Sequence, residues 1–323
     1  MIYKILNSYL DNKSKKDRNN TLITYRSEIM QLYNFIIDET KEYKTINSEK
    51  ELISSIDYIS LCEFLNHKDY KPSAYNKKLA IIKDYFNFLY SAYIIERDIS
   101  KPINFMSNEK VQETITEKEI VNKEEVKKII NTCKSNKDKL ILSIMFSSGC
   151  RVGEVLQIEL DWIQKVNIDG EEVIKISIPK KIVKNKVDRI IYLVDDMINY
   201  FNAYMETERN RKKIVAGHEK YLFITNGARS YLTIKDDKVT VRSGEINKKL
   251  KNIMNASGID KKITNHCFRH SHVVECQGQG MDLVTINDNI GWKVNNPLFT
   301  TYSKHNTEEK TKNIINTTKS LMV

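Results

Sequence analysis

From Arg151 onward the sequence contains side chains that together suit the chemistry of a phosphodiester. They occur in a fixed order: Arg151, then His266-Cys267-Phe268-Arg269-His270, then Gly291-Trp292, then Tyr302. Two guanidinium groups can hold the non-bridging oxygens of one phosphate through paired hydrogen bonds, and an imidazole and an indole N–H can donate to the same group. A phenol can attack the phosphorus. The set is typical of an enzyme that cuts and rejoins DNA.

Taken singly, these residues have ordinary structural explanations. Arg151-Val152-Gly153-Glu154 could begin a helix and contain an internal ion pair, and Trp292 and Tyr302 could be core aromatics. The combination is much harder to explain in this way, because each position that the chemistry needs is filled by a competent side chain.

A metal site is the main chemical alternative. His266 and His270 lie four residues apart, so on a helix they could bind zinc together with Cys267 or Cys276. We disfavour this site because no other Cys or His pair in the sequence supplies the remaining ligands at a familiar spacing.

Composition is compatible with a DNA-handling protein. At 323 residues, 41% hydrophobic and 29% charged, the chain falls in the soluble globular range and is long enough for two domains. The formal net charge of +10 favours a polyanionic partner, although many lysine-rich bacterial proteins do not bind nucleic acid.

Cysteine usage and hydropathy indicate the compartment. The five cysteines are an odd number and form no CxxC pair, which favours a reducing environment. The first residues lack the apolar core of a signal peptide, and no stretch has the roughly 18 consecutive apolar residues of a membrane helix. We therefore expect a cytoplasmic protein with no membrane partner.

The elements that must position the site are mainly helical. Apolar residues recur at helical spacing over 21–38 and 73–93, with 51–65 between them, which predicts a small helical bundle. The polar run near 107–118 marks a linker. We expect an N-terminal DNA-binding domain at 1–108, a linker at 109–117 and a second domain at 118–323.

The second domain is predicted to be helical with one small antiparallel sheet. Asn122 and Glu125 resemble a capping box that opens a helix, and Gly149 can end the apolar helix over 139–145. The β-branched runs 173–178 and 189–193 predict a strand pair joined by a lysine-rich turn. The remaining predicted helices cover 194–213, 243–256, 265–277, 283–289 and 307–321.

The joint pattern resembles the tyrosine recombinase family, also called phage integrases. The resemblance covers the second domain from about Thr116 to Val323, and the N-terminal part is similar to that family's helical core-binding domain. It implies that Arg151 and Arg269 clamp the phosphate and that Tyr302 is the nucleophile. His266 matches the family's first histidine, and Trp292 occupies a position that is usually histidine.

The family's catalytic lysine lies on a hairpin turn. The run Lys184-Asn185-Lys186-Val187-Asp188-Arg189-Ile190-Ile191-Tyr192-Leu193 matches the family's Lys-Gly-x-x-x-Arg-x-x-Pro-Leu pattern, with Asn185 and Tyr192 as departures. We choose Lys184 as the general acid, and Lys186 and Lys181 remain open. Glu154 and His270 are expected to brace the site residues.

The reaction that the resemblance implies is transesterification on double-stranded DNA without ATP, metal or any other cofactor. Tyr302 forms a 3′-phosphotyrosyl link that a 5′-hydroxyl later attacks, in a tetramer on paired DNA sites. The segment 307–321 either docks on the neighbouring protomer or packs on its own domain. The resemblance thus implies a site-specific recombinase that integrates, excises or exchanges strands of a mobile element or replicon. The alternatives are a replicon-dimer resolvase, a type IB topoisomerase, a telomere resolvase and an inactive DNA-binding repressor.

Overall fold

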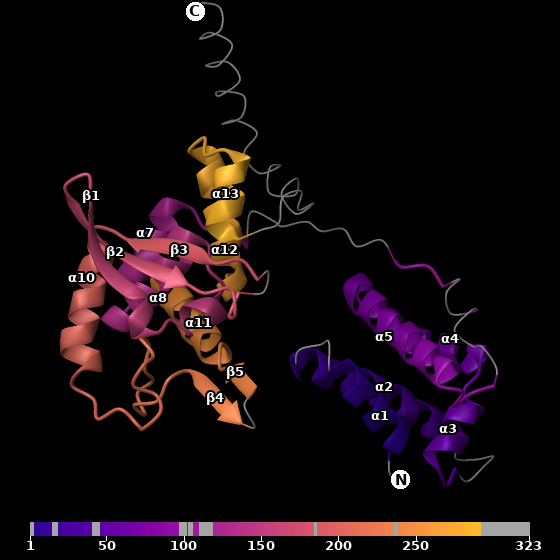
Figure 1. The fold of residues 1–323 in the computed structure, drawn as a ribbon. Coiled ribbons are helices and arrows are strands. Elements are labelled where there is room, and N and C mark those ends of the chain that lie inside the picture. Colours follow the sequence, from indigo (N-terminus) through magenta and orange to yellow (C-terminus); the bar gives the residue numbers. More distant parts are fainter. Residues whose placement is uncertain are drawn as a thin grey trace, which may run out of the picture. The chain divides into compact units, whose positions relative to one another are not determined.

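A computed structural model describes residues 3–14, 19–40, 46–96, 102, 106–109, 119–183, 186–235 and 238–291. The chain divides into two units, Met1–Gln112 and Glu113–Val323 (Figure 1). Most of the linker predicted at 109–117 lies outside the described residues. No helix in the described ranges is both long enough and apolar enough to cross a membrane.

The secondary structure described in the first unit is helical. Its helices are α1 (Lys4–Ser14), α2 (Asn19–Thr40), α3 (Glu49–Ser55), α4 (Tyr58–Asn66) and α5 (Pro72–Ser91). The helices predicted over 21–38 and 73–93 are confirmed as α2 and α5. Helix α1 was not predicted, and the stretch 51–65 is divided because Asp57 and Ser60 form a capping box that starts α4.

A buried carboxylate ties the first unit together. Glu49, at the start of α3, accepts hydrogen bonds from the backbone N–H groups of Ile5 and Leu6 at 2.7 and 2.8 Å. It also accepts one from the Tyr33 hydroxyl at 3.2 Å. Because the first N–H groups of a helix have no partner within it, Glu49 satisfies the start of α1 from another helix.

The second unit combines helices with two small sheets, as Figure 1 shows. Its first elements are α7 (Lys123–Thr132), α8 (Asn136–Ser148), α9 (Val152–Val155), the 3₁₀ turn η2 (Leu160–Trp162), and strands β1 (Ile163–Ile168), β2 (Glu171–Ile178) and β3 (Arg189–Leu193). The later ones are α10 (Asp196–Ala203), the π-helical turn η3 (Tyr204–Arg209), β4 (Leu232–Lys235), β5 (Lys238–Val241), α11 (Gly244–Ser257), α12 (Asn265–Gly278) and α13 (Leu283–Ile290). The predicted class, mainly helical with a small antiparallel sheet, is confirmed.

Local signals place α7 and α8 as expected. Asn122 and Glu125 form both hydrogen bonds of the capping box. Gly149 ends α8 with a φ of +60°, a left-handed conformation that glycine adopts without strain. The positions at which these helices begin and end therefore follow from short sequence motifs.

The sheets are more extensive than predicted. Strands β2 and β3 pair antiparallel, as expected, and β1 adds a third strand on the other edge of β2. A separate hairpin, β4–β5, was not predicted. Strand β1, with the sequence IQKVNI, has no fully buried position, so its apolar pattern was too weak to predict it.

The helix predicted over 194–213 is shorter and changes type. Helix α10 ends at Ala203 and continues as the π-helical turn η3. Arg209, at the end of this turn, is buried and donates to the backbone carbonyls of Tyr221 and Leu222, the shorter bonds being 3.0 and 3.1 Å. Tertiary contacts to a neighbouring loop therefore accompany the change from α to π geometry.

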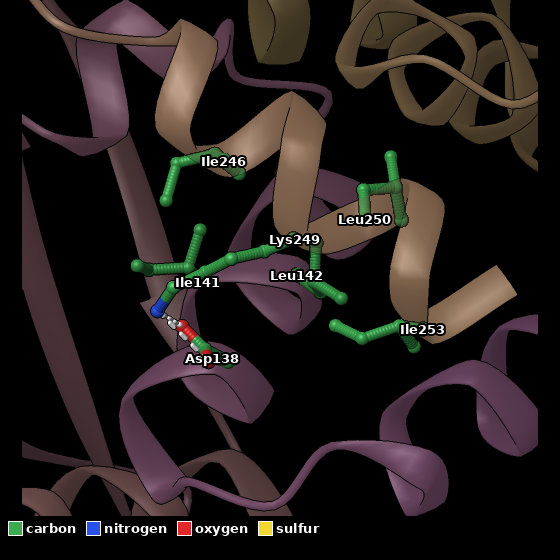
Figure 2. Close-up of a pocket in the computed structure, with 7 residues that line it drawn as sticks. All are labelled: Asp138, Ile141, Leu142, Ile246, Lys249, Leu250 and Ile253. Carbon is green, nitrogen blue, oxygen red and sulfur yellow. Dashed lines mark hydrogen bonds and ion pairs between the residues drawn. The ribbon is translucent and has the colours of Figure 1, made fainter. Parts of the chain in front are cut away.

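Helix α11 packs on α8 around an ion pair, as Figure 2 shows. Lys249 Nζ lies 2.8 and 3.1 Å from the two carboxylate oxygens of Asp138. The space between the helices is lined mainly by Ile141, Leu142, Ile246 and Leu250 and has a volume of about 10 Å³. That is about the size of one water molecule, so this gap between α8 and α11 cannot hold a substrate.

Candidate active site

Arg151 is the N-cap residue of the short helix α9, two residues after the left-handed turn at Gly149. Its backbone N–H and its Nη1 donate to the two carboxylate oxygens of Glu154, at 3.0 and 2.9 Å. The Arg151 side chain is 28% exposed, whereas that of Glu154 is 4% exposed. Glu154 thus holds Arg151 from the buried side and leaves part of the guanidinium group accessible to a ligand.

A second arginine contacts the same carboxylate. Arg189 begins β3, and its Nη1 donates to Glu154 at 3.0 Å. Its Nη2 donates to the carbonyl of Ser148 at 2.7 Å, and its Nε to that of Asn289 at 2.8 Å. The Arg189 side chain is fully buried. Arg189 therefore joins β3 to the C-terminal ends of α8 and α13.

Arg269 lies in the middle of the site and is also buried, with 1% of the residue exposed. Its Nη1 donates to the carbonyl of Gly149 at 2.6 Å, and its Nη2 to that of Ile290 at 2.8 Å. The first of these bonds joins α12 to Gly149, which precedes Arg151 by two residues in the sequence. The two arginines that the sequence singled out are therefore gathered in one region.

Positive charge accumulates here. Burial, followed by repulsion from Arg151 and Arg189, lowers the pKa of Arg269 to about 10. Arg269 still carries its proton at neutral pH. Three guanidinium groups thus lie around Glu154, which supplies one negative charge, and this excess favours an anion.

Two glycines allow the close packing behind the arginines. A Cβ on Gly149 would lie 2.7 Å from Cδ2 of His272 and 2.9 Å from Cγ2 of Ile290. Gly291 has a φ of +65°, and a Cβ there would lie 2.9 Å from Cδ of Arg189. Both turns therefore require glycine for their conformation and for the space around them.

The histidines occupy the first turns of α12. His266 is exposed, and its ring lies edge-on to that of His270, with centroids 4.3 Å apart. Burial, with contributions from His266 and Arg269, lowers the pKa of His270 to about 4. His270 is therefore neutral at physiological pH and packs against His266, which is the accessible one of the pair.

The cysteines near these histidines have other contacts. Cys267 Sγ accepts a hydrogen bond from the backbone N–H of Thr264 at 3.2 Å, and Cys276 Sγ lies 3.5 Å from Nε2 of His272. Within the described ranges, no group of three or more His, Cys, Asp or Glu side chains is arranged to hold a metal ion.

The turn between β2 and β3 has a structured base. The Asp188 carboxylate accepts from the Lys180 backbone N–H at 2.6 Å, and Val183 is fully buried. Lys181 Nζ lies 5.5 Å from the centre of the Trp162 ring. Lys186 has a φ of +55°. The structure thus describes two of the three candidate lysines, Lys181 and Lys186, and the third, Lys184, lies outside the described residues.

Three predicted site residues are therefore not described. Lys184, Trp292 and Tyr302 lie outside the described ranges, as does the segment 307–321. Arg151, Arg269 and Glu154 are described and are gathered by the contacts above, and His266 and His270 are described on the same helix as Arg269.

The sequence alone assigned no role to Arg189, which lies within the lysine-rich run 184–193. A signal was present. In β3 the buried positions are 189, 191 and 193, so Arg189 occupies an inward-facing position of the strand. A charged residue at a core position must have buried partners, and here these are one carboxylate and two carbonyl groups.

Comparison with known proteins shows the family of the chain. The profile of the phage integrase family matches residues 119–309, which is more than half of the chain. Transposase A of transposon Tn554 from Staphylococcus aureus is 24% identical over 59% of this chain, which spans only 50% of the transposase. Tyrosine recombinase XerC of Chlorobaculum tepidum is 22% identical over 84% of this chain and 81% of its own length.

Solved structures show the same fold. The pre-cleavage complex of the XerH site-specific recombinase with its difH substrate has a TM-score of 0.64 at 17% identity, over 90% of this chain and 79% of that one. A lambda integrase dimer (residues 75–356) bound to a COC′ core site has a TM-score of 0.63 at 14% identity, over 93% and 94%. With its family profile matched across the arginine site, the chain belongs to the phage integrase family of tyrosine recombinases.

Proposed function

We propose that this protein is a site-specific DNA recombinase that cleaves and rejoins DNA through a 3′-phosphotyrosyl intermediate. The observation that carries the proposal is the bond from Arg269 to the carbonyl of Gly149, which gathers Arg269 and Arg151 in a region of excess positive charge. A single phosphodiester is an anion of suitable size for such a region. Family membership supports the same reaction.

In the proposed mechanism, Arg151 and Arg269 hold the scissile phosphate, and Trp292 orients it through its indole N–H. The Tyr302 phenol attacks the phosphorus, so that a bond forms from its oxygen to phosphorus and the bond from phosphorus to the 5′-oxygen breaks. Exposing a phenolate at pH 7 costs about 4 kcal/mol, because the pKa of a phenol is about three units higher. Nearby positive charge and proton transfer to His266 lower this cost.

The leaving 5′-oxygen needs a proton, and we assign its delivery to Lys184 on the β2–β3 turn. A 5′-hydroxyl from a partner duplex then attacks the phosphotyrosyl link and releases Tyr302. The ester retains the energy of the broken bond, so ATP is not required. The arginines supply the positive charge that a metal ion supplies in other nucleases, so no metal is required.

The proposed partner is double-stranded DNA, bound by a tetramer on paired sites. Solved relatives include a lambda integrase tetramer bound to a Holliday junction. We assign DNA binding to residues 1–108, the linker to 109–117 and catalysis to 118–323, with the segment 307–321 joining protomers. Because the substrate is DNA of a mobile element or replicon, we place the protein in the cytoplasm.

The test uses a series of nicked duplexes that together cover the DNA flanking the gene. In each duplex the nick lets a short fragment dissociate after cleavage, so the cleaved strand cannot be rejoined and the covalent adduct is trapped. We expect the wild-type protein to form a covalent adduct with one of them. Tyr302→Phe should bind that duplex with unchanged affinity and form no adduct. The matched control, Tyr192→Phe, changes a tyrosine that is 43% exposed on β3 and should form the adduct normally.

Two results would contradict the proposal. An adduct of normal yield from Tyr302→Phe would exclude this residue as the nucleophile. Specific binding by the wild-type protein with no adduct on any flanking duplex would favour a repressor with the recombinase fold.

A further inference from the structure

Two buried arginines bind matching pairs of carbonyl groups. Arg189 donates to the carbonyls of residues 148 and 289, and Arg269 donates to those of 149 and 290. Each arginine therefore joins the C-terminal end of α8 to the C-terminal end of α13. Because helix C-termini carry partial negative charge and unpaired carbonyls, guanidinium groups are favourable partners for them.

Arg189 makes a third contact, to a carboxylate. Arg189 also donates to Glu154, and Glu154 in turn accepts two hydrogen bonds from Arg151. The Glu154 carboxylate thus lies between a fully buried guanidinium group and a partly exposed one. We propose that Arg189 is a positioning residue for DNA cleavage, which fixes Glu154 and through it the phosphate-binding guanidinium group of Arg151.

The geometry at Arg189 requires a guanidinium group. Its three nitrogens donate in three directions, to Glu154, Ser148 and Asn289. A lysine would keep the charge, but its single nitrogen cannot reach three acceptors arranged around a planar fork. If Arg189 is removed, the buried Glu154 carboxylate loses one partner and is free to adopt another arrangement, and Arg151 moves with it.

A purely structural role is the competing explanation, and the chain offers a matched control. Arg209 is also buried, with 6% of the residue exposed, and it donates hydrogen bonds to the carbonyls of residues 219, 221 and 222. None of these acceptors belongs to the arginine site. Arg189→Met and Arg209→Met should therefore both destabilise the second unit, whereas only Arg189→Met should alter the chemistry of cleavage.

The inference rests on the proposed function, so the assay uses the nicked duplex on which the full-length wild-type protein forms its adduct. With saturating protein, well below the unfolding temperature of each variant, Arg189→Met should cleave about 100-fold more slowly, the scale expected when a catalytic group is displaced by about 1 Å. Its dissociation constant for the duplex should remain within about threefold of the wild-type value. Arg209→Met should cleave at the wild-type rate.

A double-mutant cycle identifies the route of the effect. Glu154→Gln should slow cleavage, and Arg189→Met combined with Glu154→Gln should be no slower than the slower single variant, because both act on Arg151 through one contact. If Arg189→Met does not fold, Arg189→Lys takes its place and should be about tenfold slower at unchanged DNA affinity.

The outcomes are distinct. Absence of an adduct with the wild-type protein would overturn the proposed function, and the positioning role with it. A normal wild-type adduct together with a normal rate for Arg189→Met would overturn the positioning role alone. Equal slowing by Arg189→Met and Arg209→Met, or multiplicative effects in the cycle, would also overturn it.

Discussion

Replacing Gly149 with alanine tests how tightly the end of α8 is packed behind the arginine site. Gly149 has a φ of +60°, and its added Cβ would lie 2.7 Å from His272 and 2.9 Å from Ile290. A left-handed backbone costs alanine about 1 to 2 kcal/mol. The contacts are too short for any real Cβ, and overpacking of this kind costs about 1 to 3 kcal/mol more.

Gly258 provides the control. It ends α11 with a φ of +66°, but a Cβ there would have no heavy atom within 4 Å. Gly258→Ala should therefore lose only the conformational part, about 1 to 2 kcal/mol. The difference between the two variants isolates the packing cost, which we expect to be about 1 to 3 kcal/mol.

Urea unfolding followed by tryptophan fluorescence measures this difference. The signal reports on the second structural unit, because both tryptophans of the sequence, Trp162 and Trp292, belong to it. For a slope of about 2 kcal/mol per molar urea, the unfolding midpoint of Gly149→Ala should lie about 0.5 to 1.5 M below that of Gly258→Ala. Because the Gly149 carbonyl accepts from Arg269, Gly149→Ala should also slow cleavage. Equal midpoints for the two variants would refute the packing argument.

Three further predictions concern acid stability, the general acid and metals. Burial lowers the pKa of His272 to about 4, so between pH 6.5 and about 4 the unfolded state binds more protons than the folded state. The second unit should therefore lose about 2 kcal/mol of stability between pH 7 and 5 through this group, and His272→Leu should reduce the loss. An unchanged dependence of stability on pH in this variant would exclude the assignment. A substrate with a 5′-bridging sulfur, which leaves without protonation, should rescue Lys184→Ala but not Arg269→Ala; rescue of Lys186→Ala instead would move the general acid two residues. Chelator should leave cleavage unchanged, whereas a loss that zinc restores would favour a site at His266 and His270.

Much of the fold could be predicted because the signals are local. The apolar spacing of α2 and α5, the capping box at Asn122 and the glycine after α8 depend on a few neighbouring residues. Strand β1 was missed because it has no fully buried side, and the π-helical turn was missed because it contacts a separate loop through Arg209. Strand β1 pairs with β2 across the two-residue turn Asp169-Gly170, which is a local signal, whereas the π-helical turn depends on tertiary contacts.

The site shows the same division. The residue types at 151, 266 and 269 predicted the chemistry, and the contact between Arg151 and Glu154 could be anticipated from their spacing. The deep burial of Arg269 and the partners of Arg189 could not, because the partners of both include peptide carbonyls from α8 and α13. A main-chain oxygen is present at every position, so it leaves no mark in a sequence.

Reliance on main-chain oxygens has a consequence for divergence within the family. Any amino acid at positions 148, 289 or 290 provides the same backbone carbonyl acceptor. Substitutions there therefore preserve the hydrogen bonds from the arginines as long as the ends of the helices keep their shape. The donors have no such freedom, because only arginine offers the required fork. Distant homologues should therefore retain arginine at the positions of Arg189 and Arg269 while the residues they hold vary, and an alignment of many members can measure that contrast directly.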